Sequence, residues 1–207
     1  MSERYEYTRA SLTEADLSPS PILQLYRWLE DAVAERVVEP TAACLSTVSV
    51  DGLPSSRMVL LRGVEESGIT FFTNYLSRKG REISDNPSVC LNLWWARLER
   101  QVRVEGKVSI VSHEMSDEYW RERPRESQLA SAASPQSEPI GDRQSLLERI
   151  GELAAQFPAD VPRPEHWGGY RLAPDYFEFW QGGISRLHDR LEYRLRNGIW
   201  TIQRLAP

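Results

Sequence analysis

Short apolar segments separated by tight-turn signals constrain the fold of this chain more than any other feature of its sequence. Between Gln101 and Val108, valines alternate with polar residues, which gives a strand one apolar face and one polar face. Asp51–Gly52 and Asn197–Gly198 are dipeptides typical of the turn between two antiparallel strands. Strands joined by hairpins in this way predict an antiparallel barrel rather than β–α–β units.

The strand pattern recurs along most of the chain. Each expected strand is rich in β-branched or aromatic residues and is bounded by turn-forming residues. The expected strands are Cys44–Val50, Ser56–Leu61, Thr70–Thr73, Val89–Trp95, Gln101–Val108, Tyr170–Leu172, Tyr176–Trp180, Leu191–Leu195 and Ile199–Arg204.

Apolar residues at helical spacing predict helices between these strands. The first helix begins at Pro21 and ends before Pro40, the second covers Ser112–Arg121, and a third carries the apolar positions of Leu146–Leu153. Residues 122–142 are rich in Ser, Pro and Gln, and we expect a long loop there. The fold class is therefore mainly β with peripheral helices (α+β).

Length and composition are those of an ordinary globular protein. The chain has 207 residues, of which 41% are hydrophobic and 27% charged, and we expect a polar arm over residues 1–20 and a single domain over 21–207. The net charge of −5 argues against a nucleic-acid partner. Arginines are concentrated in the middle third, which suits a small anionic ligand. No apolar run is long enough for a membrane span and no signal segment is visible, so we expect a cytoplasmic protein without a membrane partner.

Cysteines and common catalytic motifs exclude several classes of site. Cys44 and Cys90 lie inside strand-like runs and are expected to be buried free thiols in a reducing compartment. The sequence shows no metal-ligand spacing, and we expect no metal. It also lacks a Gly-rich phosphate loop and a serine in a nucleophile elbow.

One C-terminal stretch carries most of the chemistry. Arg186, His188 and Arg190 flank Asp189, shortly after Trp180 and a Gly-Gly pair. Cationic donors beside a large aromatic suit a planar, anionic small molecule, because a guanidinium both donates and stacks. The simpler interpretation is a salt bridge around Asp189 at the end of a strand.

Further cationic and amide positions lie on other expected strands and loops of the chain. Together these segments resemble the pyridoxamine (pyridoxine) 5′-phosphate oxidase family, in collinear order from Arg4 to Pro207. The segments are Arg57–Arg62, Phe72–Asn74, Ser77–Lys79, Glu99–Gln101, Tyr119–Gln128, Gln136–Ser137, Trp167–Gly169, Trp180–Arg190 and Arg204–Pro207.

The resemblance implies an FMN-binding split β-barrel that forms a homodimer with flavin sites at the subunit interface. The loop of Gln136 and Ser137 would then be contributed by the partner subunit. The residues that the resemblance assigns to FMN are Arg57, Met58, Val59, Leu60, Leu61, Arg62, Phe72, Thr73, Arg78, Lys79, Gln101, Gln136, Ser137, Trp180 and Arg190.

The resemblance also implies a site for a phosphorylated substrate. Tyr119 and Arg123 are four residues apart at a helix end and share a face. Arg186 and His188, the expected catalytic pair, are two apart on what we expect to be an extended segment, so both would point at the substrate ring. The residues assigned to substrate are Arg4, Tyr7, Arg62, Tyr119, Arg123, Ser127, Arg186 and His188.

Each of these positions has a simpler interpretation. Arg78 and Lys79 are also typical of solvated charges at a helix start. Trp180 is typical of a core residue, and Gln101 could face solvent on its strand. Tyr119 could be a packing residue with a wet hydroxyl, and Ser137 a loop cap. The joint pattern, rather than any one residue, favours the site.

Two departures from the family pattern stand out. Arg62 occupies a position where the family commonly has Lys, and Tyr5 one where the family often has a second Arg. Regular strand alternation would also place Arg57 and Arg62 on opposite faces, so we expect a strand end or bulge near Arg62.

The implied activity is oxidation of pyridoxamine or pyridoxine 5′-phosphate to pyridoxal 5′-phosphate, with FMN as cofactor and O2 as acceptor, releasing hydrogen peroxide. One alternative is a related flavin oxidase of another planar substrate, such as a phenazine; the candidate phosphate site of Tyr119, Arg123 and Ser127 argues against it. Another is a non-catalytic flavin- or haem-binding split barrel, against which stands the pair Arg186 and His188.

Overall fold

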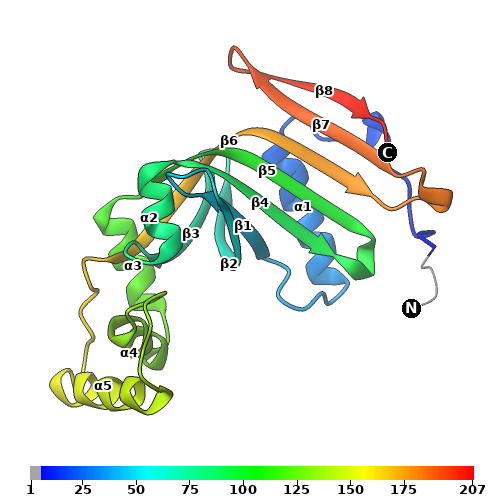
Figure 1. The fold of residues 1–207 in the computed structure, drawn as a ribbon. Coiled ribbons are helices and arrows are strands. Elements are labelled where there is room, and N and C mark those ends of the chain that lie inside the picture. Colours follow the sequence, from blue (N-terminus) through cyan, green and yellow to red (C-terminus); the bar gives the residue numbers. More distant parts are fainter. Residues whose placement is uncertain (1–5) are drawn as a thin grey trace.

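A closed antiparallel barrel forms the centre of the molecule. In the computed structural model, which describes residues 6–207, the strands pair in the order β3-β2-β1-β4-β5-β6, and β6 pairs back onto β3. The hairpin of β7 and β8 extends the sheet beyond β6 (Figure 1). The strands are β1 (Ala42–Val48), β2 (Pro54–Glu65), β3 (Gly68–Asn74), β4 (Ser88–Trp95), β5 (Arg100–Ile110), β6 (Trp167–Gln181), β7 (Asp189–Arg196) and β8 (Ile199–Leu205).

Alternating side chains fill the barrel. Leu91 and Leu93 of β4 and Val102 of β5 are fully buried, as the strict alternation of these strands predicts. Helix α1 (Pro21–Ala34) packs its apolar face on this core, where the Trp28 ring lies 5.1 Å from that of Phe179. Hydrophobic burial of this kind is the main stabilising contribution to the fold.

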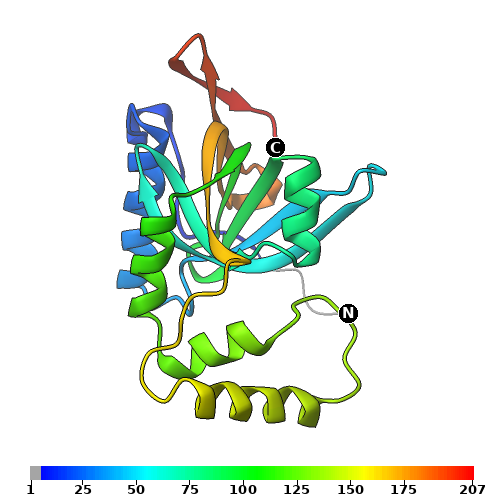
Figure 2. The same cartoon turned by 90° about the vertical axis from the view of Figure 1, so that its left-hand side faces the viewer.

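Shorter helices lie around the barrel. Helix α2 (Arg78–Asp85) follows β3, and α3 (His113–Glu122) follows β5. Helices α4 (Arg125–Ala133) and α5 (Arg143–Gln156) pair with each other at one end of the molecule (Figures 1 and 2). A second small core joins them to the barrel through Trp120, Leu129, Val161 and Trp167.

Two expectations about elements were wrong. Residues 122–142 contain α4 rather than a continuous loop, because Leu129 and Ala133 bury one side of a short helix after Pro124. The two strands expected over 170–180 form one strand, β6, although Pro174 lies inside it. The register of β5 and β6 shifts at Glu105–Gly106, opposite that proline. This β-bulge lets the strand continue although proline has no backbone N–H to donate.

The segment before α1 lies against the barrel. The Leu12 side chain belongs to the core, and its backbone nitrogen donates to Asp189 Oδ2 at 2.9 Å. Short 3-10 turns occur at Glu14–Asp16, Ala96–Leu98 and Ile184–Arg186. Across residues 6–207, no helix has the length and apolar character needed to cross a membrane.

Both cysteines are free thiols, half-buried on strands β1 and β4 rather than fully buried as expected. Burial raises the pKa of the Cys90 thiol to about 11, which keeps it protonated and unreactive at neutral pH. Within the described part of the chain, no cluster of His, Cys, Asp or Glu has the arrangement of a metal site.

Candidate functional site

A cavity opens where β2 and β3 separate. Pairing between these strands starts only at Leu61, so the preceding part of β2 and the end of β3 diverge. The cavity has a volume of about 530 Å³ and a polar lining. Its lining residues are Leu60, Arg62, Phe72, Thr73, Asn74, Tyr119, Glu122, Arg123, Pro124, Ser127, Ser131, Gln136 and Trp167.

Arg62 lines this cavity next to a β-bulge. The register between β2 and β3 shifts between Leu61 and Gly63, which confirms the expected irregularity. The cavity is lined by Leu60 and Arg62, which share one face of β2 by regular alternation. Arg57 points toward the barrel interior, opposite Leu45, so the bulge does not bring Arg57 and Arg62 to the same face.

Other members of the Arg57–Arg62 segment have different environments. Val59 and Leu61 are buried in the core, so only their backbone groups could contact a ligand. Met58 is exposed on the outer face of the barrel. The segment thus offers side chains to the cavity only at Leu60 and Arg62.

Aromatic rings form one wall of the cavity. Phe72 and Tyr119 stack with centroids 4.0 Å apart and planes 23° apart, and Trp167 lies parallel beyond them, 5.7 Å from Phe72. The Arg62 guanidinium carbon lies 5.8 Å from the Tyr119 ring centroid. This wall is suited to a flat ligand with nearby negative charge.

Arg123 supplies the cavity with an incompletely paired cation. Its Nη2 donates to Ser131 Oγ at 2.9 Å, while its buried Nη1 has no hydrogen-bond partner among residues 6–207. Burial lowers the pKa of this guanidinium, although it remains charged at neutral pH. A buried donor without a partner is costly, and an anionic ligand would satisfy it.

Lys79 lies beside the cavity and is buried, with 7% of its surface exposed. Its Nζ donates to Thr73 Oγ1 and to Gln136 Oε1, both at 2.9 Å, and to Ser77 Oγ at 3.1 Å. Burial, reinforced by the charge of Arg57, lowers the pKa of Lys79 to about 8. The interpretation of Lys79 as a solvated charge is therefore wrong.

Gln136 belongs with its own chain in this structure. Its side chain contacts Lys79 and Thr73 of the same chain across the cavity. The contribution of this loop by a partner subunit stays a prediction. Ser137 follows it with a φ of 77°, in the left-handed region, at an exposed turn.

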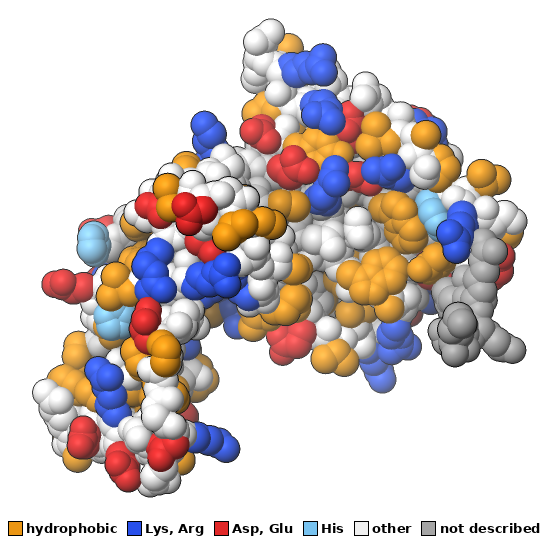
Figure 3. All heavy atoms as spheres, in the orientation of Figure 1, with side chains coloured by type: hydrophobic (Ala, Val, Ile, Leu, Met, Phe, Trp, Pro, Cys, Tyr) orange, Lys and Arg blue, Asp and Glu red, His pale blue; other side chains and the backbone are white. Residues whose placement is uncertain are grey.

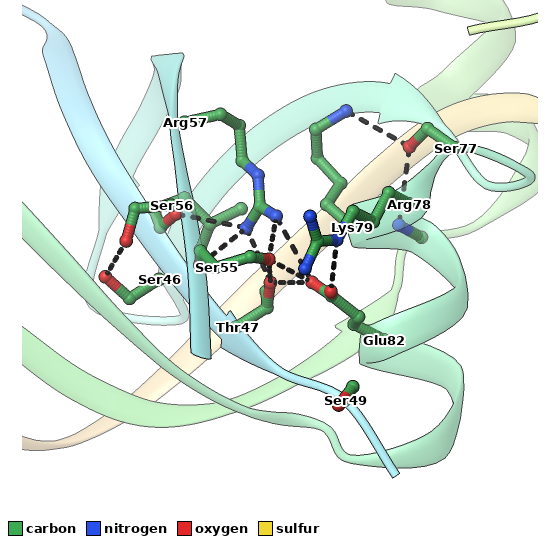
Figure 4. Close-up of polar contacts among 12 residues, drawn as sticks. Ser46, Thr47, Ser49, Ser55, Ser56, Arg57, Ser77, Arg78, Lys79 and Glu82 are labelled. Carbon is green, nitrogen blue, oxygen red and sulfur yellow. Dashed lines mark hydrogen bonds and ion pairs between the residues drawn. The ribbon is translucent and has the colours of Figure 1, made fainter. Parts of the chain in front are cut away.

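Arg57 and Arg78 converge on one carboxylate, that of Glu82 (Figure 4). Arg57 Nη2 lies 3.2 Å from Glu82 Oε2, and Arg78 Nε lies 2.8 Å from Glu82 Oε1. The Arg78 side chain is 59% exposed, so its outer nitrogens face solvent near Lys79. Sequence reasoning missed Glu82, although its spacing of four residues from Arg78 on one helix was a usable signal.

A second group of expected site residues lies on neighbouring strands. Trp180 on β6 is in register with Gln101 on β5 and Arg190 on β7. The Trp180 ring lies 4.6 Å from that of His188, and the Tyr7 ring lies 5.5 Å from both. These five residues form what we call the tryptophan group. Trp180 is half-buried rather than a core residue.

Buried contacts hold Arg190 in this group. Its Nε donates to Glu178 Oε1 and its Nη1 to the Ala206 carbonyl, each at 2.8 Å. The hydrogen bond to Glu178, only 3% exposed, raises the pKa of Arg190. Asp189 instead pairs with Arg204, so the salt bridge expected around Asp189 exists with a different arginine.

The segment of Arg186 and His188 is not extended. The expectation that their side chains point the same way, as on an extended strand, is therefore wrong. Residues Ile184–Arg186 form a 3-10 turn in which Ser185 and Arg186 have φ values of 56° and 65°. His188 Nδ1 accepts from the Gly183 backbone nitrogen at 3.1 Å, and Arg186 is exposed. Arg4, also expected at the substrate, lies outside the described residues.

Two family models match the chain. One, described as pyridoxamine 5′-phosphate oxidase, matches residues 29–157, and the other, described as the pyridoxine 5′-phosphate oxidase C-terminal dimerisation region, matches residues 167–207. The chain belongs to the pyridoxamine 5′-phosphate oxidase family. The split barrel expected from the resemblance is thereby confirmed.

Relatives and solved structures agree with the family. The pyridoxine/pyridoxamine 5′-phosphate oxidases of Mannheimia succiniciproducens and Acaryochloris marina are 50% and 49% identical, over 99% of this chain and 97% and 94% of theirs. PhzG from Burkholderia lata, solved with tetrahydrophenazine-1-carboxylic acid, has a TM-score of 0.89 and 35% identity over 93% of this chain and 95% of its own.

The cavity and the tryptophan group lie at opposite ends of the molecule. Figure 1 shows α2, α3 and α4 at one end, and the connection between β6 and β7 at the other. A single oxidase chain therefore does not bring Arg186 and His188 to Arg62, Tyr119 and Arg123. Three members of the tryptophan group, Trp180, His188 and Arg190, fall within residues 167–207, which match the dimerisation region of the family.

Proposed function

We propose that this chain is an FMN-dependent oxidase that converts pyridoxamine or pyridoxine 5′-phosphate to pyridoxal 5′-phosphate. The observation that carries the proposal is the unpartnered Nη1 of Arg123 in a polar, aromatic-walled cavity beside Arg62. A phosphorylated pyridine ring has the dianion and the flat ring that this cavity suits.

The residues beside the cavity fit the phosphate of FMN. Arg78 and Lys79 open helix α2, and Lys79 has its amine buried among hydroxyl and amide oxygens. The helix start adds backbone donors to these cations, although Ser77 already caps one of them. The chemistry that FMN supplies is acceptance of a hydride from the substrate carbon, after which O2 takes the electrons and forms hydrogen peroxide.

The chain's own residues bind and orient the substrate in this proposal. Arg62, Tyr119, Arg123 and Ser127 would hold its phosphate at the cavity. Arg186 and His188 would contact the ring. Such positioning accounts for a large part of the rate in reactions where a cofactor carries the redox step.

We further propose that the site is shared between two copies in a homodimer. Met58 on β2 and Trp94 on β4 are exposed on the barrel strands. Figure 3 shows apolar side chains gathered on the face of the molecule that it presents. A second copy packed on this face would bring its tryptophan group to the cavity of the first. We place the enzyme in the cytoplasm, a reducing compartment suited to its two free thiols.

Steady-state turnover tests the proposal. Pyridoxine 5′-phosphate and O2 should give equal amounts of aldehyde and hydrogen peroxide, and the amine substrate should also release ammonia. The similarity to PhzG makes an oxidase of a reduced phenazine the second candidate. Turnover of a tetrahydrophenazine carboxylate without turnover of either phosphorylated vitamer would favour that candidate and end the first.

A further inference from the structure

Glu82 is a buried carboxylate among the cations that the proposed FMN site uses. It lies on α2 with 5% of its surface exposed, and four side chains donate to it. Its Oε2 accepts from the hydroxyls of Thr47 and Ser55 and from Arg57, and its Oε1 accepts from Arg78. A buried charge with this many donors is fixed in orientation.

The contacts of Arg78 leave donors free for a ligand. Its only hydrogen bond to the described residues uses Nε, so both terminal nitrogens remain available. Arg57, in contrast, has its terminal Nη1 occupied within the protein, where it donates to the Leu45 carbonyl and to Thr47 Oγ1. Glu82 therefore joins one inward-facing arginine of β2 to one outward-facing arginine of α2.

The charge balance also involves Glu82. Arg57 and Arg78 contact this carboxylate, and Lys79 follows Arg78 on the same helix. The three cations and one carboxylate leave a net charge near +2 for a ligand phosphate that is a dianion at neutral pH. Without the carboxylate, the charge of Arg57 would act undiminished on Lys79 and Arg78. Arg57 would keep its bonds to Leu45 and Thr47, whereas Arg78 would lose its only hydrogen bond to the described residues.

We propose that Glu82 is a positioning residue of the cofactor site, whose carboxylate fixes Arg57 and Arg78 so that Arg78 and Lys79 present their donors to the phosphate of FMN. This inference rests on the proposed function, since it assumes that FMN binds at the start of α2. Glu82 itself touches neither the cofactor nor the substrate.

Titration of the apoprotein with two flavins tests the inference. FMN and riboflavin differ only in the phosphate, and binding of either is followed by quenching of flavin fluorescence. Glu82→Gln should raise the Kd for FMN about tenfold or more and leave the Kd for riboflavin within about twofold. Glu82→Asp keeps the charge and should recover part of the FMN affinity.

Controls separate positioning from other roles. Asp85→Asn removes an equal charge from the exposed end of the same helix and should change neither Kd. In a double-mutant cycle, Arg78→Gln should weaken FMN binding strongly in the wild-type background and weakly in Glu82→Gln. If Glu82→Gln does not fold, the Glu82→Asp variant still decides, because it should weaken FMN binding more than riboflavin binding.

Three results would overturn the inference. Unchanged or tighter FMN binding in Glu82→Gln would show that the carboxylate does not position the arginines. Equal losses for FMN and riboflavin, with a lower melting temperature, would show a purely structural role. Additive effects of the two substitutions would uncouple Glu82 from Arg78. Failure of the wild-type protein to bind FMN would instead refute the proposed function.

Discussion

At the scale of single residues, Arg62 and Arg123 carry most of the proposed substrate recognition. Arg62 lines the cavity beside Leu60, next to the bulge between Leu61 and Gly63. Arg123 donates from Nη2 to Ser131 Oγ, and its Nη1 has no hydrogen-bond partner among residues 6–207. Both are close to aromatic rings, which limits their conformational freedom and leaves their donors directed at a ligand.

Arg62→Ala should raise the KM for pyridoxine 5′-phosphate by about tenfold to a hundredfold, because a charge-assisted contact is lost. The loss for unphosphorylated pyridoxine should be smaller, and Arg62→Lys should be tolerated. Steady-state kinetics of both variants on both substrates makes the measurement, with Arg149→Ala on the exposed face of α5 as the control. Equal losses on the two substrates would assign Arg62 to the fold or to FMN.

The lowered pKa of Lys79 predicts that FMN binding depends on pH. Its pKa is lowered to about 8, so the amine is a cation at pH 7 and loses its charge as the pH rises through 8. The FMN phosphate is already a dianion in this range. The Kd of the apoprotein for FMN should therefore rise up to about tenfold between pH 7 and pH 9.

The Lys79→Arg variant provides the control for this pH dependence, since a guanidinium keeps its charge throughout. Its Kd for FMN should stay flat from pH 7 to pH 9. A wild-type Kd that is equally flat would remove Lys79 from the phosphate site.

At the scale of elements, the cavity exists because β2 and β3 diverge while β3 stays paired with β6. Gly169 on β6 permits close packing there, since a Cβ at this position would lie 2.8 Å from the Phe72 ring and from Val111. The aromatic wall of the cavity is thus held against a strand backbone, which couples the barrel to the site.

Gly169→Ala should displace Phe72 and lower the stability of the protein by about 1–3 kcal/mol, as overpacking does. It should also weaken FMN binding. Gly151→Ala is the matched control, because nothing lies within 4 Å of the added carbon on α5. That control should be neutral or stabilising by up to about 1 kcal/mol. Thermal melting and flavin titration measure both effects; a Gly169→Ala protein as stable as the control would contradict the packing argument.

Elements with a strong local pattern were predictable from sequence. The strands from Cys44 to Val108 follow from alternation and turn residues, and α1 follows from its proline and apolar spacing. Helix α4 was missed because its few apolar residues give little periodicity. The partners of Lys79 and the role of Glu82 depend on contacts between distant segments, which local pattern does not encode.

At the scale of the whole molecule, the expected site residues form two groups that one chain keeps apart. The cavity contains Arg62, Tyr119 and Arg123, and the other end contains Trp180 and His188. Sequence reasoning grouped them around one substrate because it had no information on which end each would occupy. In the proposed homodimer, each copy would complete the site of the other.

Complementation between two inactive variants shows whether each site is built from two copies. Arg123→Ala damages the cavity, and Arg186→Leu damages the opposite end, so each homodimer should have little turnover. Differently tagged chains, co-expressed and purified as a heterodimer, should regain about half of the wild-type turnover, because one of two symmetric sites is then intact. A folded heterodimer as inactive as both parents would contradict a site built from two copies.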